Sequence, residues 1–83
     1  MELSAAPIWD SARRHGITDE AIRHALRNFI AVAGDPSSED VTLFLGSDAA
    51  GNLVEVGVLD TDEGPVVIHA MRGRLHRFFS DKE

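Results

Sequence analysis

The stretch LVEVGVLDTDEGPVVIHAMR, residues 53–72, decides the fold of this chain. Its first part alternates apolar residues with Glu55 and Gly57. This period of two predicts a strand over residues 53–59 with one core face and one open face. A short acidic turn follows, and the apolar run after it predicts another strand over residues 65–72. Strands joined by so short a turn pair antiparallel, so the stretch predicts a β-hairpin.

Upstream of the hairpin, the pattern predicts two further strands and two helices. Alternation predicts a strand over residues 41–46, and a short strand is expected over residues 30–33. Pro7, which suits a first helical turn, and a basic last turn predict a helix over residues 7–15. Apolar residues spaced three and four apart predict a second helix over residues 18–29, with a buried stripe made of Ile22, Ala25, Leu26 and Phe29.

The fold class that follows is α+β, in a single domain over residues 1–83. We expect the two N-terminal helices to pack on one face of a three- to four-stranded antiparallel meander sheet. Residues 73–83 form a tail in which Leu75, Phe78 and Phe79 have helical spacing. The tail is therefore expected either to be irregular or to include a short C-terminal helix.

The composition excludes several kinds of site. The chain has no cysteine, which excludes disulfides and thiolate metal sites. Its four histidines lack a metal-ligand spacing, so neither a metal nor a cofactor is expected. The N-terminus has neither a basic start nor an apolar run, and no segment has the roughly 18 apolar residues of a membrane span. We therefore expect a cytoplasmic protein with no membrane contact.

Charge is distributed unevenly along the chain. The net charge is −6, and residues 35–65 contain eight acidic residues with no lysine or arginine. All cationic side chains lie nearer one end of the chain or the other. If the two ends meet in the fold, one face of this acidic protein is basic. The alternative is a solvated surface of mixed charge.

The last predicted strand carries the main candidate for chemistry, His69. Strict alternation places Val66, Ile68 and Ala70 on the helix-covered face and His69 on the open face. A neutral imidazole there can act as a general base, and Arg72 nearby can bind a phosphodiester. The alternative is a partly buried histidine that hydrogen-bonds to backbone.

A second basic cluster lies near the N-terminus. Arg13, Arg14 and His15 follow one another, and Arg74 adds a cation just after the last strand. These side chains can hold phosphate oxygens. Alternatively, the cluster complements the dipole at the end of the predicted first helix, and Arg74 is a surface charge.

Three segments, taken in order, resemble the BrnT-type toxins of bacterial toxin–antitoxin pairs, which are related in fold to RelE-like ribonucleases. They are the basic-His-Gly helix start Arg14-His15-Gly16-Ile17-Thr18-Asp19-Glu20-Ala21-Ile22, the hairpin Leu43-Phe44-Leu45-Gly46 and Gly51-Asn52-Leu53-Val54-Glu55-Val56, and the strand Val67-Ile68-His69-Ala70-Met71-Arg72. The resemblance covers roughly residues 13–74.

The resemblance implies a compact α+β endoribonuclease that cuts RNA without a metal and is neutralised by an antitoxin protein. By position, Arg14 and His15 match the basic-His pair of the family, and His69-Ala70 matches its Ser-Ala. The arginine that follows in the family falls on either Met71 or Arg72.

The expected site therefore consists of His69, Arg72 and His15 as catalytic residues, with Arg13, Arg14, Arg72 and Arg74 binding RNA phosphate. The alternative hypothesis is a non-catalytic interaction module of the same fold. It would form a homodimer or bind a protein partner through the open sheet face or a sheet edge.

Overall fold

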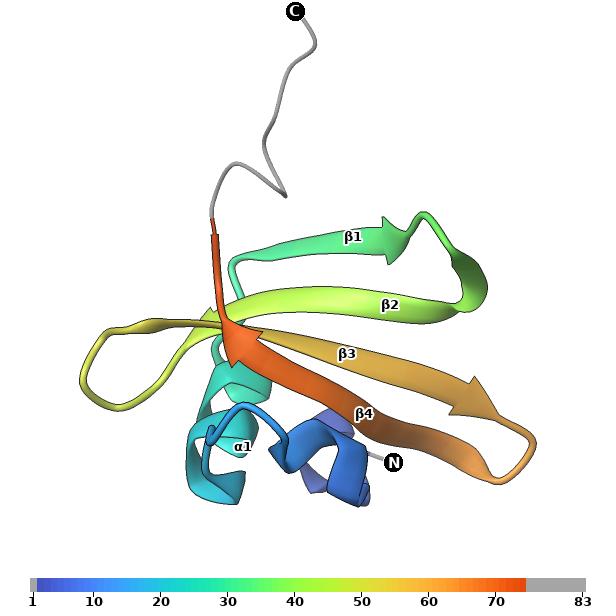
Figure 1. Cartoon of the computed structure of the whole chain (residues 1–83), viewed down its shortest axis with the longest axis horizontal. Coiled ribbons are helices and arrows are strands. Elements are labelled where there is room, and N and C mark those ends of the chain that lie inside the picture. The colour runs from blue at the N-terminus through green and yellow to red at the C-terminus, as the bar shows by residue number, and fades with distance from the viewer. Residues whose placement is uncertain (1, 75–83) are drawn as a thin grey trace, which may run out of the picture.

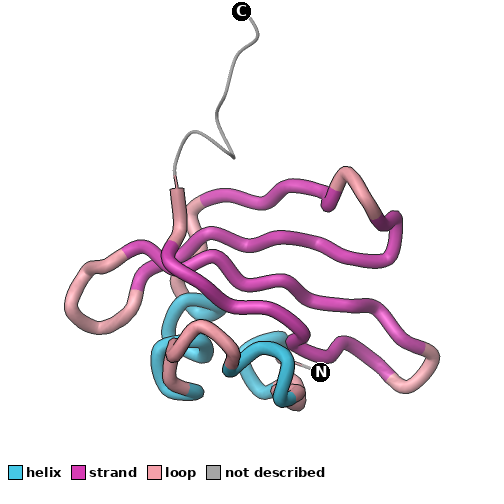
Figure 2. Tube along the Cα trace, in the orientation of Figure 1, coloured by secondary structure: helices cyan, strands magenta, loops and turns pink. Residues whose placement is uncertain are grey.

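The computed structural model of the chain describes residues 2–74 and contains one antiparallel sheet with helical segments against one of its faces (Figures 1 and 2). Each strand pairs with the next strand in the sequence, so the sheet is a meander. Its strands, in order, are β1 (Ala31–Asp35), β2 (Ser38–Ser47), β3 (Leu53–Thr61) and β4 (Gly64–Arg72). The predicted strands over residues 41–46, 53–59 and 65–72 lie within β2, β3 and β4.

The predicted architecture with two N-terminal helices packed on the sheet is wrong. The structure is mostly sheet and, over residues 2–74, contains one α-helix, α1 (Asp19–Arg27). The segment predicted as a helix over residues 7–15 contains only one short 3-10 turn, η2 (Asp10–Arg13). A second 3-10 turn, η1 (Leu3–Ala5), precedes this segment.

Between the two 3-10 turns the chain is extended and pairs with the outer edge of β4. Ile8 forms a parallel bridge with Val67. The Val67 N–H donates to the Pro7 carbonyl at 2.8 Å, and the Trp9 N–H donates to the Val67 carbonyl at 2.9 Å. A helix pairs its backbone internally and could not supply these partners. Satisfying the sheet edge therefore overrides the helical preference of this segment.

Helix α1 begins with a side-chain cap and ends earlier than predicted. The Thr18 hydroxyl accepts the N–H of Ala21 at 3.0 Å. The backbone leaves helical geometry at Asn28, with φ −131° and ψ 38°, so Phe29 lies outside the helix. Phe29 is 45% exposed and its ring meets that of Phe44 edge-on at 5.1 Å. Its predicted place in the buried helical stripe is therefore wrong.

Helix α1 crosses the sheet at a glycine. Gly46 in β2 is buried beneath the helix, and a Cβ atom placed on it would lie 2.2 Å from the carbonyl oxygen of Ala25. The absent side chain lets the helix backbone touch the sheet directly. The core between the two layers is completed by apolar residues of all the packed elements, namely Ala6, Ala12, Ile17, Ile22, Ala25, Leu26, Val54, Val56, Val58, Val67 and Ala70.

A β-bulge in β4 changes which residues face this core. Gly57 pairs with His69, but the next residue, Val58, pairs with Val67, so Ile68 is the extra residue. Val67 and Ala70 consequently lie in the helix-covered core. Strict alternation had placed Val66, Ile68 and Ala70 there, and the bulge is the reason for the difference.

The other sheet face is also partly buried, contrary to the open face that was expected. Val41, Leu43 and Leu45 in β2 are at most 7% exposed, although they belong to a separate group from the helix-covered core. Gly73 continues the ladder beyond β4 by donating its N–H to Leu53, and it lies against the Leu45 side chain. Strand β3 is therefore buried on both faces along its centre.

Most of the predicted tail, including the short C-terminal helix, lies outside the described residues. Within residues 2–74, no helix is long and apolar enough to cross a membrane.

Candidate active site

A carboxylate–histidine pair lies across β3 and β4. Nε2 of His69 lies 3.0 Å from Oε2 of Glu55. The Glu55 side chain is 2% exposed and that of His69 is 32% exposed, so the carboxylate is enclosed and the imidazole reaches the surface. When Glu55 is ionised, its carboxylate only accepts hydrogen bonds and Nε2 of His69 is the donor. In the neutral ring of that tautomer, Nδ1 keeps a lone pair that can accept a proton.

Glycine opposite His69 makes room for the imidazole. Gly57 pairs with His69 across the ladder, and a Cβ atom at Gly57 would lie 3.0 Å from the His69 Cβ. Glu55 is two residues before Gly57 and therefore projects from the same face of β3. This diagonal arrangement brings the carboxylate and the ring together.

The structure brings His15 to this pair. The His15 and His69 rings lie 6.1 Å apart between centroids, with their planes at 78°. His15 follows η2, which is held against β4 by the bond from the Ser11 hydroxyl to the Ile68 carbonyl at 2.7 Å. The extended pairing of residues 7–9 with Val67 fixes the same segment. Two histidines from opposite ends of the chain thus meet on one carboxylate-bearing patch.

A hollow of about 330 Å³ lies beside the pair. Glu55 and His69 line one part of it, the end of β1 contributes Asp35, and the β1–β2 turn contributes Ser37. Its remaining lining is apolar and comes from Val41, Leu43 and Ile68. Its lining is thus divided about equally between polar and apolar groups, and convergent polar groups in a concavity are one feature of a binding site.

The predicted arginines do not join the histidines. Arg13 is bound by Asp19 and Asp10, at 2.8 Å in each ion pair, and these bonds raise the pKa of its guanidinium. Arg72 pairs with Asp48 at 3.6 Å. Arg14 and Arg74 are exposed and form no ion pair among residues 2–74.

The register separates the two candidates for the arginine of the resembling family. Met71 pairs with Glu55 and therefore shares the sheet face of His69. Arg72 pairs with Val54 at the end of β4, on the opposite face. The residue on the histidine side is thus an uncharged methionine.

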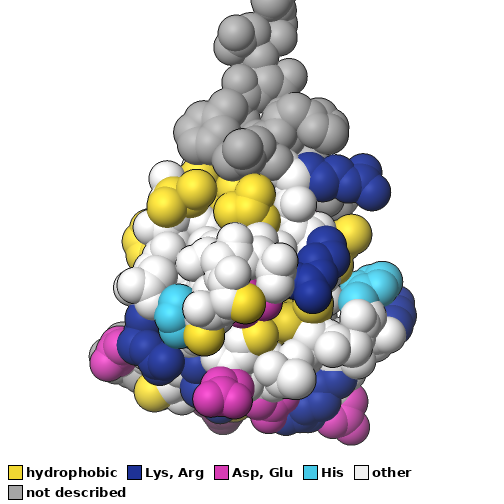
Figure 3. All heavy atoms as spheres, turned by 90° about the vertical axis from the view of Figure 1, so that its left-hand side faces the viewer, with side chains coloured by type: hydrophobic (Ala, Val, Ile, Leu, Met, Phe, Trp, Pro, Cys, Tyr) yellow, Lys and Arg dark blue, Asp and Glu magenta, His cyan; other side chains and the backbone are white. Residues whose placement is uncertain are grey.

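Basic side chains are distributed rather than gathered. Figure 3 shows arginine side chains at several separate places on one face of the molecule, between hydrophobic and acidic ones. This view favours the mixed-charge surface over a continuous basic face on that side.

Within the described part of the chain, no group of three or more His, Asp or Glu side chains is placed to hold a metal ion.

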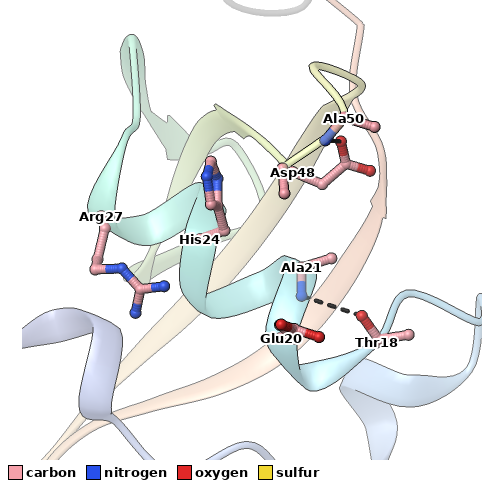
Figure 4. Close-up of a pocket in the computed structure, with 8 residues that line it drawn as sticks. Thr18, Glu20, Ala21, His24, Arg27, Asp48 and Ala50 are labelled. Carbon is pink, nitrogen blue, oxygen red and sulfur yellow. Dashed lines mark hydrogen bonds between the residues drawn. The ribbon is translucent and has the colours of Figure 1, made fainter.

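A second hollow, also of about 330 Å³, lies between α1 and the β2–β3 turn (Figure 4). His24 and Arg27 project from the helix on one side, and Asp48 and Ala50 lie across from them on the turn. Two of the polar side chains here, His24 and Asp48, already have structural partners. Nδ1 of His24 contacts the Ser47 carbonyl at 2.6 Å, and Asp48 accepts the N–H groups of its own turn. This hollow is therefore a weaker candidate site.

Asp48 makes the stability of this turn sensitive to acid. The backbone N–H of Asn52 lowers the pKa of Asp48 most, and the Asn52 side chain, the Ala50 N–H and Arg72 lower it further. A lowered folded-state pKa stabilises the fold above the ordinary value of 3.8, and this contribution is lost as the pH falls through the folded pKa. We expect urea unfolding, measured between about pH 5 and about pH 2, to show it.

In that measurement the Asp48→Asn variant should lose part of the acid dependence. The matched Asp62→Asn variant, in the exposed β3–β4 turn, should keep it. Equal acid dependence in both variants and the unchanged protein would contradict this assignment.

Sequence reasoning missed Glu55 as a functional residue. Its alternation with valines suggested a solvent-facing carboxylate, whereas the residue is 1% exposed. The sequence of β2 did indicate that Glu55 could be buried, because apolar Val41, Leu43 and Leu45 occupy one face of that strand and Phe44 the other. A strand that is apolar on both faces indicates burial on both sides of its neighbour.

Comparison of the chain with protein-family models, with curated proteins and with solved structures finds no match. The resemblance to BrnT-type toxins therefore depends on the motif residues alone and stays a prediction. What can be argued about function depends on the geometry around His69.

Proposed function

We propose that this protein is an endoribonuclease that cuts single-stranded RNA by transfer of protons between imidazoles and the reacting oxygens. The observation that carries the proposal is the contact of His69 with both the buried Glu55 and His15. Proton transfer to or from a positioned histidine contributes about 10²- to 10⁴-fold in such reactions. The family resemblance supports the same activity.

In the proposed reaction, Nδ1 of His69 accepts the proton of an RNA 2′-hydroxyl. The O2′ atom attacks the adjacent phosphorus, and the bond between phosphorus and the 5′-oxygen breaks. His15, in its protonated form, gives a proton to the departing 5′-oxygen. The products are a 2′,3′-cyclic phosphate and a 5′-hydroxyl end, and the two histidines then exchange protons with water.

The proposed role of Glu55 is to position His69 rather than to touch the substrate. Its bond to Nε2 selects the tautomer with a free Nδ1 and stabilises the imidazolium that forms. Arg14, next to His15 and exposed, is the arginine best placed in sequence to contact phosphate. Arg13 and Arg72 are engaged by carboxylates and are assigned no part in the reaction.

The test is an incubation of purified protein with a single-stranded RNA in the presence of a metal chelator. We expect fragments that end in a 2′,3′-cyclic phosphate, identified by mass spectrometry. The matched control is the same oligomer with 2′-deoxy sugars, which has no nucleophile and should stay intact. Failure to cut the RNA, or equal cutting of the 2′-deoxy oligomer, would overturn the proposal.

Replacing Glu55 should lower activity by more than a loss of stability can explain. The Glu55→Leu variant removes one partner of the pair and leaves His69 without its carboxylate, and breaking a buried pair in this way is destabilising. We expect a lower thermal midpoint, so kcat is measured well below that midpoint. We also expect kcat to fall by about 10- to 100-fold with a small change in KM, because the substrate does not contact Glu55.

The exposed Glu39 provides the matched control for this variant. Glu39→Leu should change neither the thermal midpoint nor kcat. In addition, ¹⁵N spectra of the His69 ring should show loss of the single tautomer only in Glu55→Leu. A variant that retains full kcat would remove Glu55 from the site.

A further inference from the structure

The two edges of the sheet differ in what covers them. The outer edge of β4 is paired with residues 7–9 through the bridge from Ile8 to Val67. The opposite edge is β1, whose only strand partner among residues 2–74 is β2. An uncovered strand edge is a template for pairing with another chain.

The β1 edge is also where exposed apolar side chains gather. Phe29, Ile30 and Val32 are 45%, 61% and 51% exposed, and they make up three of the four large exposed hydrophobic residues among residues 2–74. The fourth, Trp9, lies beside the opposite edge. We call Phe29, Ile30, Val32 and the outer backbone of β1 the apolar edge. Exposed apolar groups that cluster in this way mark interaction surfaces.

The usual protection against pairing is confined to the end of the strand. Residues 31–34 contain no charged residue and no proline, whereas Asp35 ends the strand and Pro36 follows it. Proteins that keep an edge strand unpaired commonly place lysine, proline or a bulge on it. The irregular register of β1 occurs only at its end, between Gly34 and Asp35.

We propose that a second copy of this chain binds the apolar edge, with the two β1 strands antiparallel about a twofold axis. The contact is isologous, so one self-complementary surface serves both copies. It would join two four-stranded sheets into one continuous sheet. The apolar side chains of each copy would then be covered by those of the other.

Charge at the two ends of β1 selects the antiparallel arrangement. The exposed Arg27 ends α1, four residues before β1, whereas Asp35 ends β1 and the exposed Glu39 and Asp40 lie at the start of β2, beyond the turn. An antiparallel pair brings the basic end of each copy to the acidic end of the other, while a parallel pair would set like charges side by side. The uncharged centre also lets two molecules of net charge −6 approach.

The proposed contact runs along the outer edge of β1 and does not include the Glu55–His69 pair. These two residues lie on β3 and β4, and β2 separates them from β1, whose last residue, Asp35, lines the hollow beside the pair. Dimer formation and RNA cleavage are thus independent proposals. Because the domain is small, pairing would also raise its stability, by an amount that grows with the logarithm of protein concentration.

Sedimentation equilibrium from about 1 µM to about 1 mM protein tests the contact. We expect a monomer–dimer equilibrium in which Val32→Lys raises Kd by at least about tenfold, because it places a charge on the apolar edge. The matched control is Trp9→Lys, which removes a similarly exposed apolar side chain elsewhere. The control should keep Kd within about twofold.

Cross-linking gives a second measurement that does not depend on Val32→Lys folding. The chain has no cysteine, so a single one can be introduced at Ala33, the central residue of β1. Under mild oxidation the Ala33→Cys variant should form a disulfide-linked dimer much faster than Ala49→Cys, which lies in the exposed β2–β3 turn. Equal cross-linking of the two variants would overturn the proposal. A protein that stays monomeric throughout, or loses affinity equally in Val32→Lys and Trp9→Lys, would also overturn it.

Discussion

The His69→Ala variant is expected to cleave RNA about 10²- to 10⁴-fold more slowly in kcat/KM than the unchanged protein. His69 is the one residue that contacts both other members of the proposed site, Glu55 and His15. Its loss would remove the group that accepts the 2′-hydroxyl proton. Glu55 cannot replace it, because the carboxylate is enclosed and 2% exposed.

The matched control for His69→Ala is His24→Ala. His24 is also partly buried and also hydrogen-bonded, to the Ser47 carbonyl at 2.6 Å, but it lies in the second hollow (Figure 4). We expect its cleavage rate to stay within about threefold of the unchanged protein. Cleavage is measured with an end-labelled RNA after identical purification of all proteins. Equal rates in the two variants would point to a contaminating nuclease and contradict the assignment of His69.

The Gly46→Ala variant is expected to lose about 3 kcal/mol or more of its free energy of unfolding. The added methyl group would lie 2.2 Å from the Ala25 carbonyl oxygen and 2.9 Å from the Ala25 Cα. These are backbone atoms, so relief requires α1 to move away from β2. A domain of this length has roughly 4–12 kcal/mol of total stability, and a large part of the molecules could unfold.

Gly34→Ala provides the matched control for Gly46→Ala. Gly34 lies in β1 and does not have a positive φ, and a methyl group added to it would meet no other atom within 4 Å. We expect its free energy of unfolding to change by less than about 1 kcal/mol, because no packing is disturbed. Urea unfolding followed by circular dichroism measures both variants. Similar unfolding midpoints would show that α1 does not pack on Gly46 as described.

The site and the core of this protein share strand β3. Val54, Val56 and Val58 face the helix-covered core, while Glu55 and Gly57 face His69. The strand that stabilises the fold therefore also positions the proposed site. An enclosed carboxylate is unfavourable in a small core unless it has partners, and His69 is such a partner. Glu55→Leu breaks this pair, so it is expected to lower both the stability and the activity.

The sequence pattern correctly predicted the features that depend on interactions between near neighbours in the chain. Period-two alternation located the interiors of β2, β3 and β4, because side chains on adjacent strand positions must face opposite sides. The Thr18 cap located the start of α1, because its hydroxyl acts within one turn. The end of α1 and the structure of residues 7–15 were predicted wrongly, since both depend on contacts with distant strands.

The same contrast between local and long-range interactions applies to the candidate site. Residue type and the position of His69 late in the last strand made it the main candidate, and the proximity of His15 could only be hypothesised. The bulge at Ile68 changed which sheet face its neighbouring residues occupy. A prediction from strict alternation assumes that no extra residue is present, so it could not include this change. Glu55 was missed because its burial depends on the second face of the sheet.

By itself, the sequence determined the strands, the turns between them and the capped start of the helix, because each follows from interactions between near neighbours in the chain. Only the tertiary structure decided that Glu55, His69 and His15 meet. It also decided that Arg13 and Arg72 are held by carboxylates, and that β1 has a strand partner on only one side among residues 2–74. The physical reason is that strand register, the bulge and the pairing of residues 7–9 with β4 join segments that are far apart in the chain.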